Sequence, residues 1–219
     1  VVGRGWTQPG GRPHAEEMAL AQAGASAKGA EIYVTMEPCA HESARGPTCS
    51  NAIIDAKPKR VIVATLDADE RTRRRGIDRM GDAGIPVSVG IREPEARRAM
   101  AGFLSRVEKA RPFVTLKLAL SLDGCIAMAD GSSQWITGDR ARAHAHLERA
   151  RSDAILVGAG TAKADRPTLD VRTDGLTDRS PQPVILGNDP EMPAHWLQIS
   201  GPAAIADLWH RLMTEVLGY

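Results

Sequence analysis

The sequence has few aromatic residues, no long apolar run and almost no net charge. Lys and Arg total 28 against 27 Asp and Glu, so the formal net charge is +1. A chain with this balance lacks the broad positive field that attracts nucleic acid or anionic lipid. No stretch approaches the roughly 18 apolar residues that a membrane-spanning helix needs. We therefore expect a protein with a small-molecule ligand and with neither nucleic-acid nor membrane partners.

Cysteine is also scarce. The 219 residues include only Cys39, Cys49 and Cys125, an odd number, and no apolar leader begins the chain. Both features predict a cytoplasmic protein whose thiols stay reduced or bind metal. The first residues read like the end of a strand that enters a loop. We therefore expect a natural N-terminal segment to precede them.

Apolar, β-branched runs alternate with helical patterns in the first half of the chain. The pattern predicts strands at 32–36, 61–66 and 87–91, and helices at 15–23, 49–56 and 77–83. This alternation favours an α/β fold with a mainly parallel sheet. One amphipathic helix within 92–112 would close the unit. We place the boundary near Arg111, which predicts domains at 1–110 and 111–219.

The second half also predicts an α/β unit. A buried strand is expected at 113–124, a helix at 140–152, strands at 153–160 and 181–187, and a final helix at 203–216. A dinucleotide-binding glycine loop is disfavoured at 158–163, because Lys163 stands where the third glycine of G-x-G-x-x-G should be.

A group of side chains suited to zinc lies at the predicted strand-to-helix junctions. His14 and Glu16 open one helix, Cys39 follows a strand directly after a proline, and Cys49 opens the next helix. A catalytic zinc ion takes three protein ligands and leaves a position for water, whose pKa it lowers toward neutrality. Glu16 would then move protons without ligating the metal. A structural zinc clip with His41 as fourth ligand, or small buried cysteines, remain alternatives.

The spacing H-x-E followed by P-C and a second cysteine is the signature of zinc nucleobase deaminases. The segment "AHESARGPT" between the two cysteines resembles that in the deaminase half of the bifunctional deaminase and reductase of riboflavin biosynthesis. The resemblance implies a cytidine-deaminase-like domain with His14, Cys39 and Cys49 as zinc ligands, Glu16 as the proton shuttle, and His41 and Arg45 lining the pyrimidine and phosphate pocket. For Arg75, within the basic run 71–75, the alternatives are a phosphate contact and a solvated loop.

The segment 115–172 resembles the reductase half of the same enzyme, whose fold is similar to dihydrofolate reductase. The resemblance implies NADPH-dependent reduction of a ribosyl to a ribityl chain, and a homodimer. The substrate contacts that it implies are Ser133, Arg149, Leu169 and Arg172, and the NADPH contacts are Ala119, Trp135, Thr161 and Asp165.

The leading hypothesis is therefore hydrolytic deamination of 2,5-diamino-6-(5-phosphoribosylamino)pyrimidin-4-one followed by NADPH-dependent reduction of the product. The family's glycine loop is not found after a later strand, so we expect an incomplete reductase domain. One alternative is a zinc deaminase whose second domain is not catalytic. Another is a zinc-stabilised nucleic-acid-binding module that uses the run 71–75.

Overall fold

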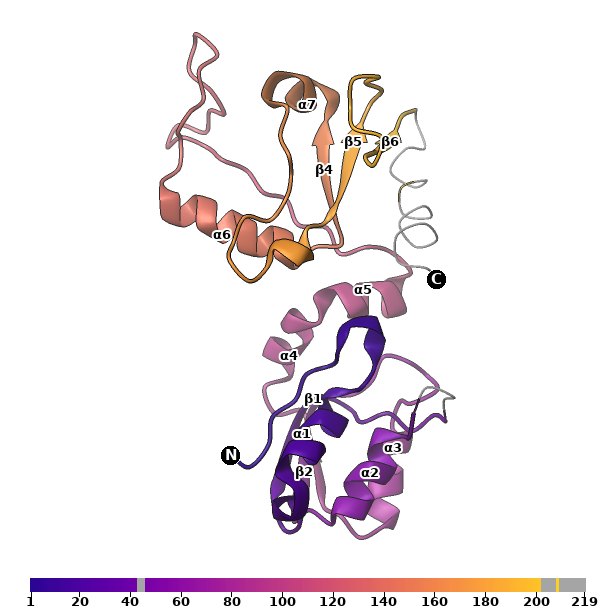
Figure 1. Ribbon diagram of the computed structural model, residues 1–219. Helices are drawn as coiled ribbons and strands as arrows, with labels where there is room; N and C mark the ends of the chain where they lie inside the picture. Colours follow the sequence, from indigo (N-terminus) through magenta and orange to yellow (C-terminus); the bar gives the residue numbers. More distant parts are fainter. Residues whose placement is uncertain (43–45, 202–207, 209–219) are drawn as a thin grey trace. The chain divides into compact units, whose positions relative to one another are not determined.

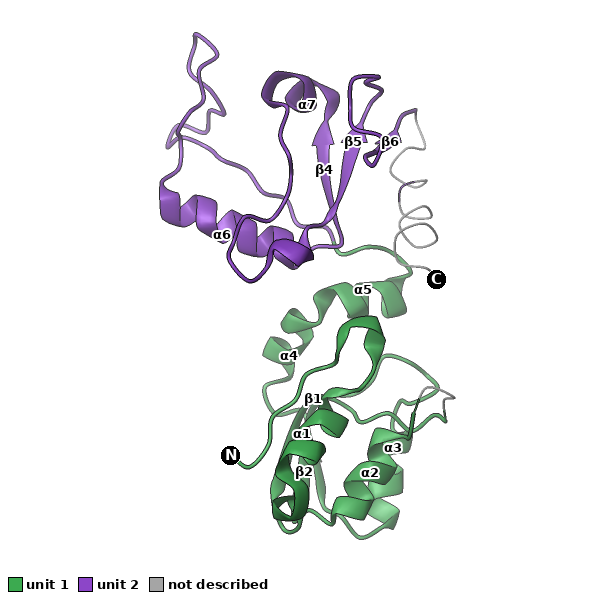
Figure 2. Ribbon diagram, in the orientation of Figure 1, with its two compact units in different colours: residues 1–113 green, residues 114–219 purple. Residues whose placement is uncertain are grey.

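The protein is described by a computed structural model that covers residues 1–42, 46–201 and 208. The chain divides into two compact units, residues 1–113 and 114–219 (Figure 2). Within the described residues, no helix combines the length and the apolarity needed to cross a membrane.

The first unit is a parallel sheet with helices packed against it (Figure 1). Its strands are β1 (Glu31–Met36), β2 (Arg60–Thr65) and β3 (Val87–Val89), and its helices are α1 (Ala15–Ala23), α2 (Cys49–Ala56), α3 (Arg75–Asp82), α4 (Glu93–Ala99) and α5 (Ala101–Lys109), with short 3-10 turns η1 (Pro9–Gly11) and η2 (Gly24–Ala27). The strand order is β1-β2-β3, and Val34 pairs with Val63 in the parallel register. Parallel strands of this kind are rich in β-branched residues because both faces of the sheet are covered.

One face of this sheet carries the core of the first unit. Val61 and Val63 of β2 are fully buried and pack with Ile53 of α2 and Met80 of α3. The alternation of side chains along β2 directs Ile62 to the opposite face, where it is also buried. The carboxyl ends of β1 and β2 therefore lie at one edge of a rigid, packed sheet.

The second unit contains another parallel sheet, with the order β4-β5-β6. Its elements are α6 (Asp139–Ala150), β4 (Ala154–Gly158), α7 (Ala159–Asp165), η3 (Thr177–Arg179), β5 (Gln182–Leu186) and β6 (Leu197–Ile199). Adjacent residues of β5 point to opposite faces, and both Val184 and Ile185 are fully buried. Ile185 packs with Ala162 of α7 and with Trp196.

The structure overturns two of the expected elements. The strand predicted at 113–124 is wrong: this segment is not in a strand, and Leu116 is 79% exposed. Its alternating pattern has the periodicity of a strand, but a strand also needs a hydrogen-bonded neighbour, and β4 to β6 pair only with one another among the described residues. The single helix expected within 92–112 is divided at Met100, where the backbone leaves the helical region. Gly102, of low helix propensity, lies two residues after this break. The helix predicted at 203–216 falls almost entirely outside the described residues.

Candidate metal centre

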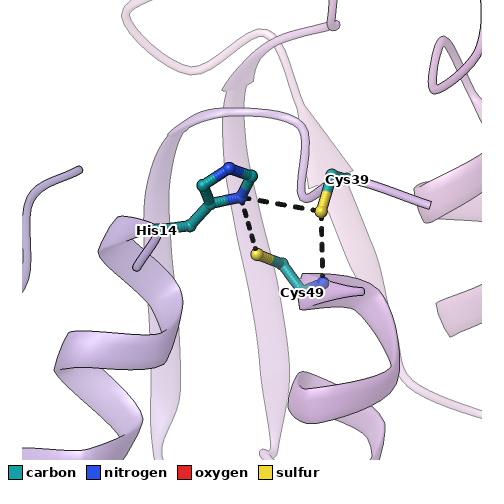
Figure 3. A group of neighbouring side chains, drawn as sticks. All are labelled: His14, Cys39 and Cys49. Carbon is teal, nitrogen blue, oxygen red and sulfur yellow. Dashed lines mark hydrogen bonds between the residues drawn. The ribbon is translucent and has the colours of Figure 1, made fainter. Parts of the chain in front are cut away.

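Three chain segments bring the predicted zinc ligands to one edge of the first sheet. His14 is the N-terminal capping residue of α1, Cys39 follows β1, and Cys49 is the first residue of α2. The backbone N–H of His14 donates to the Glu17 carboxylate at 2.7 Å, which closes the first turn of α1. Figure 3 shows the imidazole turned toward both sulfurs.

The distances between the three ligand atoms fit a single metal ion. The Nδ1 atom of His14 lies 3.2 Å from the Sγ of Cys49 and 3.6 Å from the Sγ of Cys39 (Figure 3). All three ligand atoms lie within 4.8 Å of one another. A tetrahedral zinc ion with ordinary bond lengths separates a nitrogen and a sulfur ligand by about 3.6 Å. The donor set and its dimensions therefore suit zinc.

Burial and mutual hydrogen bonding separate the acidities of the two thiols. The hydrogen bond from Cys49 lowers the pKa of Cys39 to about 5, helped by the Cys49 backbone N–H and the nearby imidazole. The same shared proton raises the pKa of Cys49. A metal ion held here would take both sulfurs as thiolates, so its binding would release protons.

Glu16 lies beside this cluster and is not one of its ligands. Burial raises the pKa of its carboxyl group, while hydrogen bonding to its own backbone and the nearby imidazole partly oppose that shift. Within the part of the chain that the structure describes, the metal-binding group consists of one imidazole and two thiols. A half-buried carboxyl group next to such a cluster is suited to carry protons.

The sequence analysis overlooked Glu37, two residues before Cys39. Its carboxylate is 2% exposed and accepts hydrogen bonds from the backbone N–H groups of four residues in the loop after β2 and the first turn of α3. The donors are Asp67 (3.3 Å), Arg74 (2.9 Å), Gly76 (3.1 Å) and Ile77 (3.3 Å). Glu37 thus ties the segment before a metal ligand to the basic loop. Its place before Pro-Cys is a weak sequence signal, because a charged residue at a strand end is usually exposed.

The resemblance to the deaminase half predicts three pocket residues, and the structure describes two of them. The His41 ring hydrogen-bonds with the hydroxyl group of buried Thr72 at 3.1 Å, so it does not act as a fourth ligand in this structure. Arg75 is exposed at the first residue of α3. Arg45 lies outside the described residues.

In the second unit, two of the predicted substrate residues, Arg149 and Arg172, lie where helix α6 contacts the segment 170–172. Arg149 of α6 donates through Nη1 to the carbonyl oxygen of Asp170 at 3.0 Å. The backbone N–H of Arg172 donates to Nδ1 of His146, one turn earlier on α6, at 3.2 Å. Burial, followed by the charge of Arg172, lowers the pKa of Arg149. Two cations held this close together suit a polyanionic group.

The other residues predicted for the second unit occupy varied environments. Leu169 is 5% exposed and packs in the core with Ala162. Trp135 is 70% exposed and lies under the guanidinium group of Arg142, 4.4 Å from the ring centre. Ala119 is half-buried, and the remaining predicted residues are exposed: Ser133, Thr161 and Asp165.

Known protein families match two separate parts of the chain. Residues 1–65 match the family model "Cytidine and deoxycytidylate deaminase zinc-binding region", and residues 112–207 match "RibD C-terminal domain". A crystal structure of a diaminohydroxyphosphoribosylaminopyrimidine deaminase / 5-amino-6-(5-phosphoribosylamino)uracil reductase from Thermotoga maritima superposes with a TM-score of 0.86. It is 31% identical, over 99% of this chain and 68% of its own. The chain belongs to the RibD family.

Curated RibD relatives match over most of the chain. The riboflavin biosynthesis protein RibD of Aquifex aeolicus (strain VF5) is 45% identical over 192 residues, and that of Escherichia coli (strain K12) is 46% identical over 180 residues. These matches cover 88% and 82% of this chain. The chain spans about half the length of these curated RibD proteins, 53% and 49%. RibD membership confirms the predicted α/β fold class, a cytidine-deaminase-like zinc domain followed by a reductase-type domain.

Proposed function

We propose that the first unit catalyses the hydrolytic deamination of 2,5-diamino-6-(5-phosphoribosylamino)pyrimidin-4-one. One observation carries this proposal: an imidazole and two thiols converge at metal-ligand distances beside a half-buried carboxyl group that is outside the ligand group. A structural zinc site would normally recruit a fourth protein ligand, and it would leave Glu16 without a task. The name of the Thermotoga maritima relative supports the choice of substrate.

The residues of the site divide the chemistry among themselves. His14, Cys39 and Cys49 would hold zinc, which when bound supplies an activated water nucleophile. Glu16 takes the proton of the attacking water and delivers it to the departing amino group. Its raised pKa suits this cycle, because burial makes the carboxylate a stronger proton acceptor than an ordinary surface glutamate. His41, Arg45 and Arg75 are proposed to bind the pyrimidine and phosphate groups.

The second unit is proposed to reduce the ribosyl chain of the deaminated product with NADPH. Support comes from the match of residues 112–207 and from the paired cations at Arg149 and Arg172, which suit the 5-phosphate. Ser133 and Leu169 are proposed to complete the substrate contacts. The NADPH contacts are proposed from the resemblance alone: Ala119, Trp135, Thr161 and Asp165.

Replacement of Glu16 tests the deaminase proposal. We expect Glu16→Gln to retain zinc, because Glu16 is not a ligand, and to lose ammonia release from the diaminopyrimidine substrate. Metal analysis and an ammonia assay on the same sample measure both quantities. Glu31→Gln is the matched control, because the Glu31 carboxylate pairs with Arg60 at the surface. A Glu16→Gln protein that deaminates at the parental rate would refute the proton-shuttle role.

A deaminase with a non-catalytic second unit is the alternative function. The exposed segment 113–124 favours it, because the second unit here lacks a strand that its sequence pattern predicts. Titration with NADPH in the presence of the deaminated product separates the two functions, since the alternative requires neither binding nor oxidation of the cofactor.

The proposed assembly and compartment are a homodimer in the cytoplasm. The homodimer rests on the resemblance to the reductase half, and light scattering of the purified chain tests it. The cytoplasm is supported by Cys39 and Cys49, neither of which is in a disulfide, since thiolates persist as metal ligands in a reducing compartment.

A further inference from the structure

One guanidinium group contacts all three segments that carry the metal ligands. Nη2 of Arg12 lies 3.8 Å from the Sγ of Cys39. Its Nη1 donates to the carbonyl oxygen of Pro47 at 2.8 Å, two residues before Cys49. The same Nη1 donates to Glu17 at 2.9 Å, and the same Glu17 oxygen accepts the backbone N–H of His14.

The surroundings of Arg12 make these contacts stronger than those of a surface arginine. Its side chain is only 11% exposed. A Cβ atom at Gly46 would lie 3.1 Å from Nη1, so the loop before Cys49 passes close against the guanidinium group. A planar fork with several donors can hold separate acceptors at fixed angles, which a lysine ammonium group on a flexible stem does not do.

Charge favours the same arrangement. Two thiolates and a neutral imidazole around a divalent cation sum to zero. The carboxylate of Glu17 then adds negative charge close to the sulfurs, as its effect on Cys49 shows. The guanidinium group of Arg12 offsets this charge and offers a hydrogen bond to one sulfur. Groups that hydrogen-bond to metal ligands orient them and adjust how strongly they bind the metal.

We propose that Arg12 is a positioning residue of the metal centre, which holds Cys39, the loop before Cys49 and the first turn of α1 in the geometry that binds zinc. The inference rests on the proposed function only in requiring that the site binds zinc. It adds a residue that neither the H-x-E nor the P-C motif contains.

Zinc affinity measured by competition with a chromophoric chelator tests the proposal on the full chain. We expect Arg12→Met to weaken zinc binding by about 10- to 100-fold, the range typical of partners that hydrogen-bond to ligands. Arg12→Lys should lose less, because it keeps the positive charge without the fork. Arg60→Met is the matched control: it breaks the surface pair with Glu31 away from the metal group, and zinc affinity should stay at the parental value.

A second readout separates positioning from general stability. With Co²⁺ in place of zinc, we expect Arg12→Met to shift the thiolate-to-cobalt charge-transfer absorption, whereas Arg60→Met leaves it unchanged. If Arg12→Met does not fold, Arg12→Lys decides the question by the same two measurements. Parental zinc affinity together with an unchanged cobalt spectrum in the Arg12 variants would overturn the inference alone. A parental chain that binds no zinc would overturn the proposed function as well.

Discussion

Glu37→Gln is the substitution whose effect can be worked out most fully from the structure. Oε2 of Glu37 accepts the N–H groups of Asp67 and Arg74, and Oε1 accepts those of Gly76 and Ile77. Glutamine has nearly the same shape, but only one of its two terminal atoms is an acceptor. Its NH₂ group would face two backbone donors in a buried place.

The expected cost follows from the two lost hydrogen bonds. A buried donor that loses its partner costs about 1–3 kcal/mol. Whichever way the amide turns, one of the two donors that lose their acceptor makes a long contact of 3.3 Å in the parent, which favours the lower part of the range. We therefore expect Glu37→Gln to lower the free energy of unfolding of the first unit by about 2–4 kcal/mol. The loop from Asp67 to Ile77 should loosen first.

Amide hydrogen exchange, resolved by residue, measures both the size and the place of the effect. We expect protection to fall most at residues 67–77 and least in β2. Glu31→Gln is the control, because ion pairs at the surface, such as that of Glu31 with Arg60, contribute little to stability. Parental protection at 67–77 in Glu37→Gln, or an unfolding free energy changed no more than in the control, would refute the reasoning.

Three further predictions concern other parts of the chain. Gly76→Ala should destabilise the first unit by about 1–3 kcal/mol, because its Cβ would lie 2.2 Å from the Pro38 carbonyl oxygen, whereas Gly81→Ala in the same helix meets no atom; urea unfolding compares the two. Pairing with Arg71 lowers the pKa of Asp69 to about 2 from its ordinary value of 3.8, so this stabilisation is complete above the ordinary value and is lost as the pH falls toward 2. The Asp69→Asn protein should show a smaller loss of stability in that window, and an acid titration identical to the parent's would contradict this. Arg172→Ala should raise KM for the phosphorylated reductase substrate far more than for its dephosphorylated analogue, and equal effects in steady-state assays would remove the phosphate role.

The ligand group of the site was predictable because its signal is local. His14 and Cys49 stand at helix starts, Cys39 follows a strand, and parallel strands bring such positions to one edge of a sheet. Glu37 and Arg12 carry no comparable signal. The backbone donors to Glu37 lie 30 to 40 residues away in the chain. Arg12 contacts Cys39 and Pro47, which lie 27 and 35 residues away. Only the folded chain therefore shows that this guanidinium group and this carboxylate are enclosed near the cluster.

By itself, the sequence determined the α/β character of both units, most element positions in the first unit, and which three side chains gather as candidate metal ligands. These follow from periodicity and residue chemistry, which act within a few residues of each other. Tertiary structure alone decided that the segment at 113–124 is not a strand here, and which charged side chains contact the segments of the candidate metal centre. Both outcomes depend on neighbours distant in the chain: a strand exists only beside another strand, and a charge is stable in the interior only where folding brings it a partner.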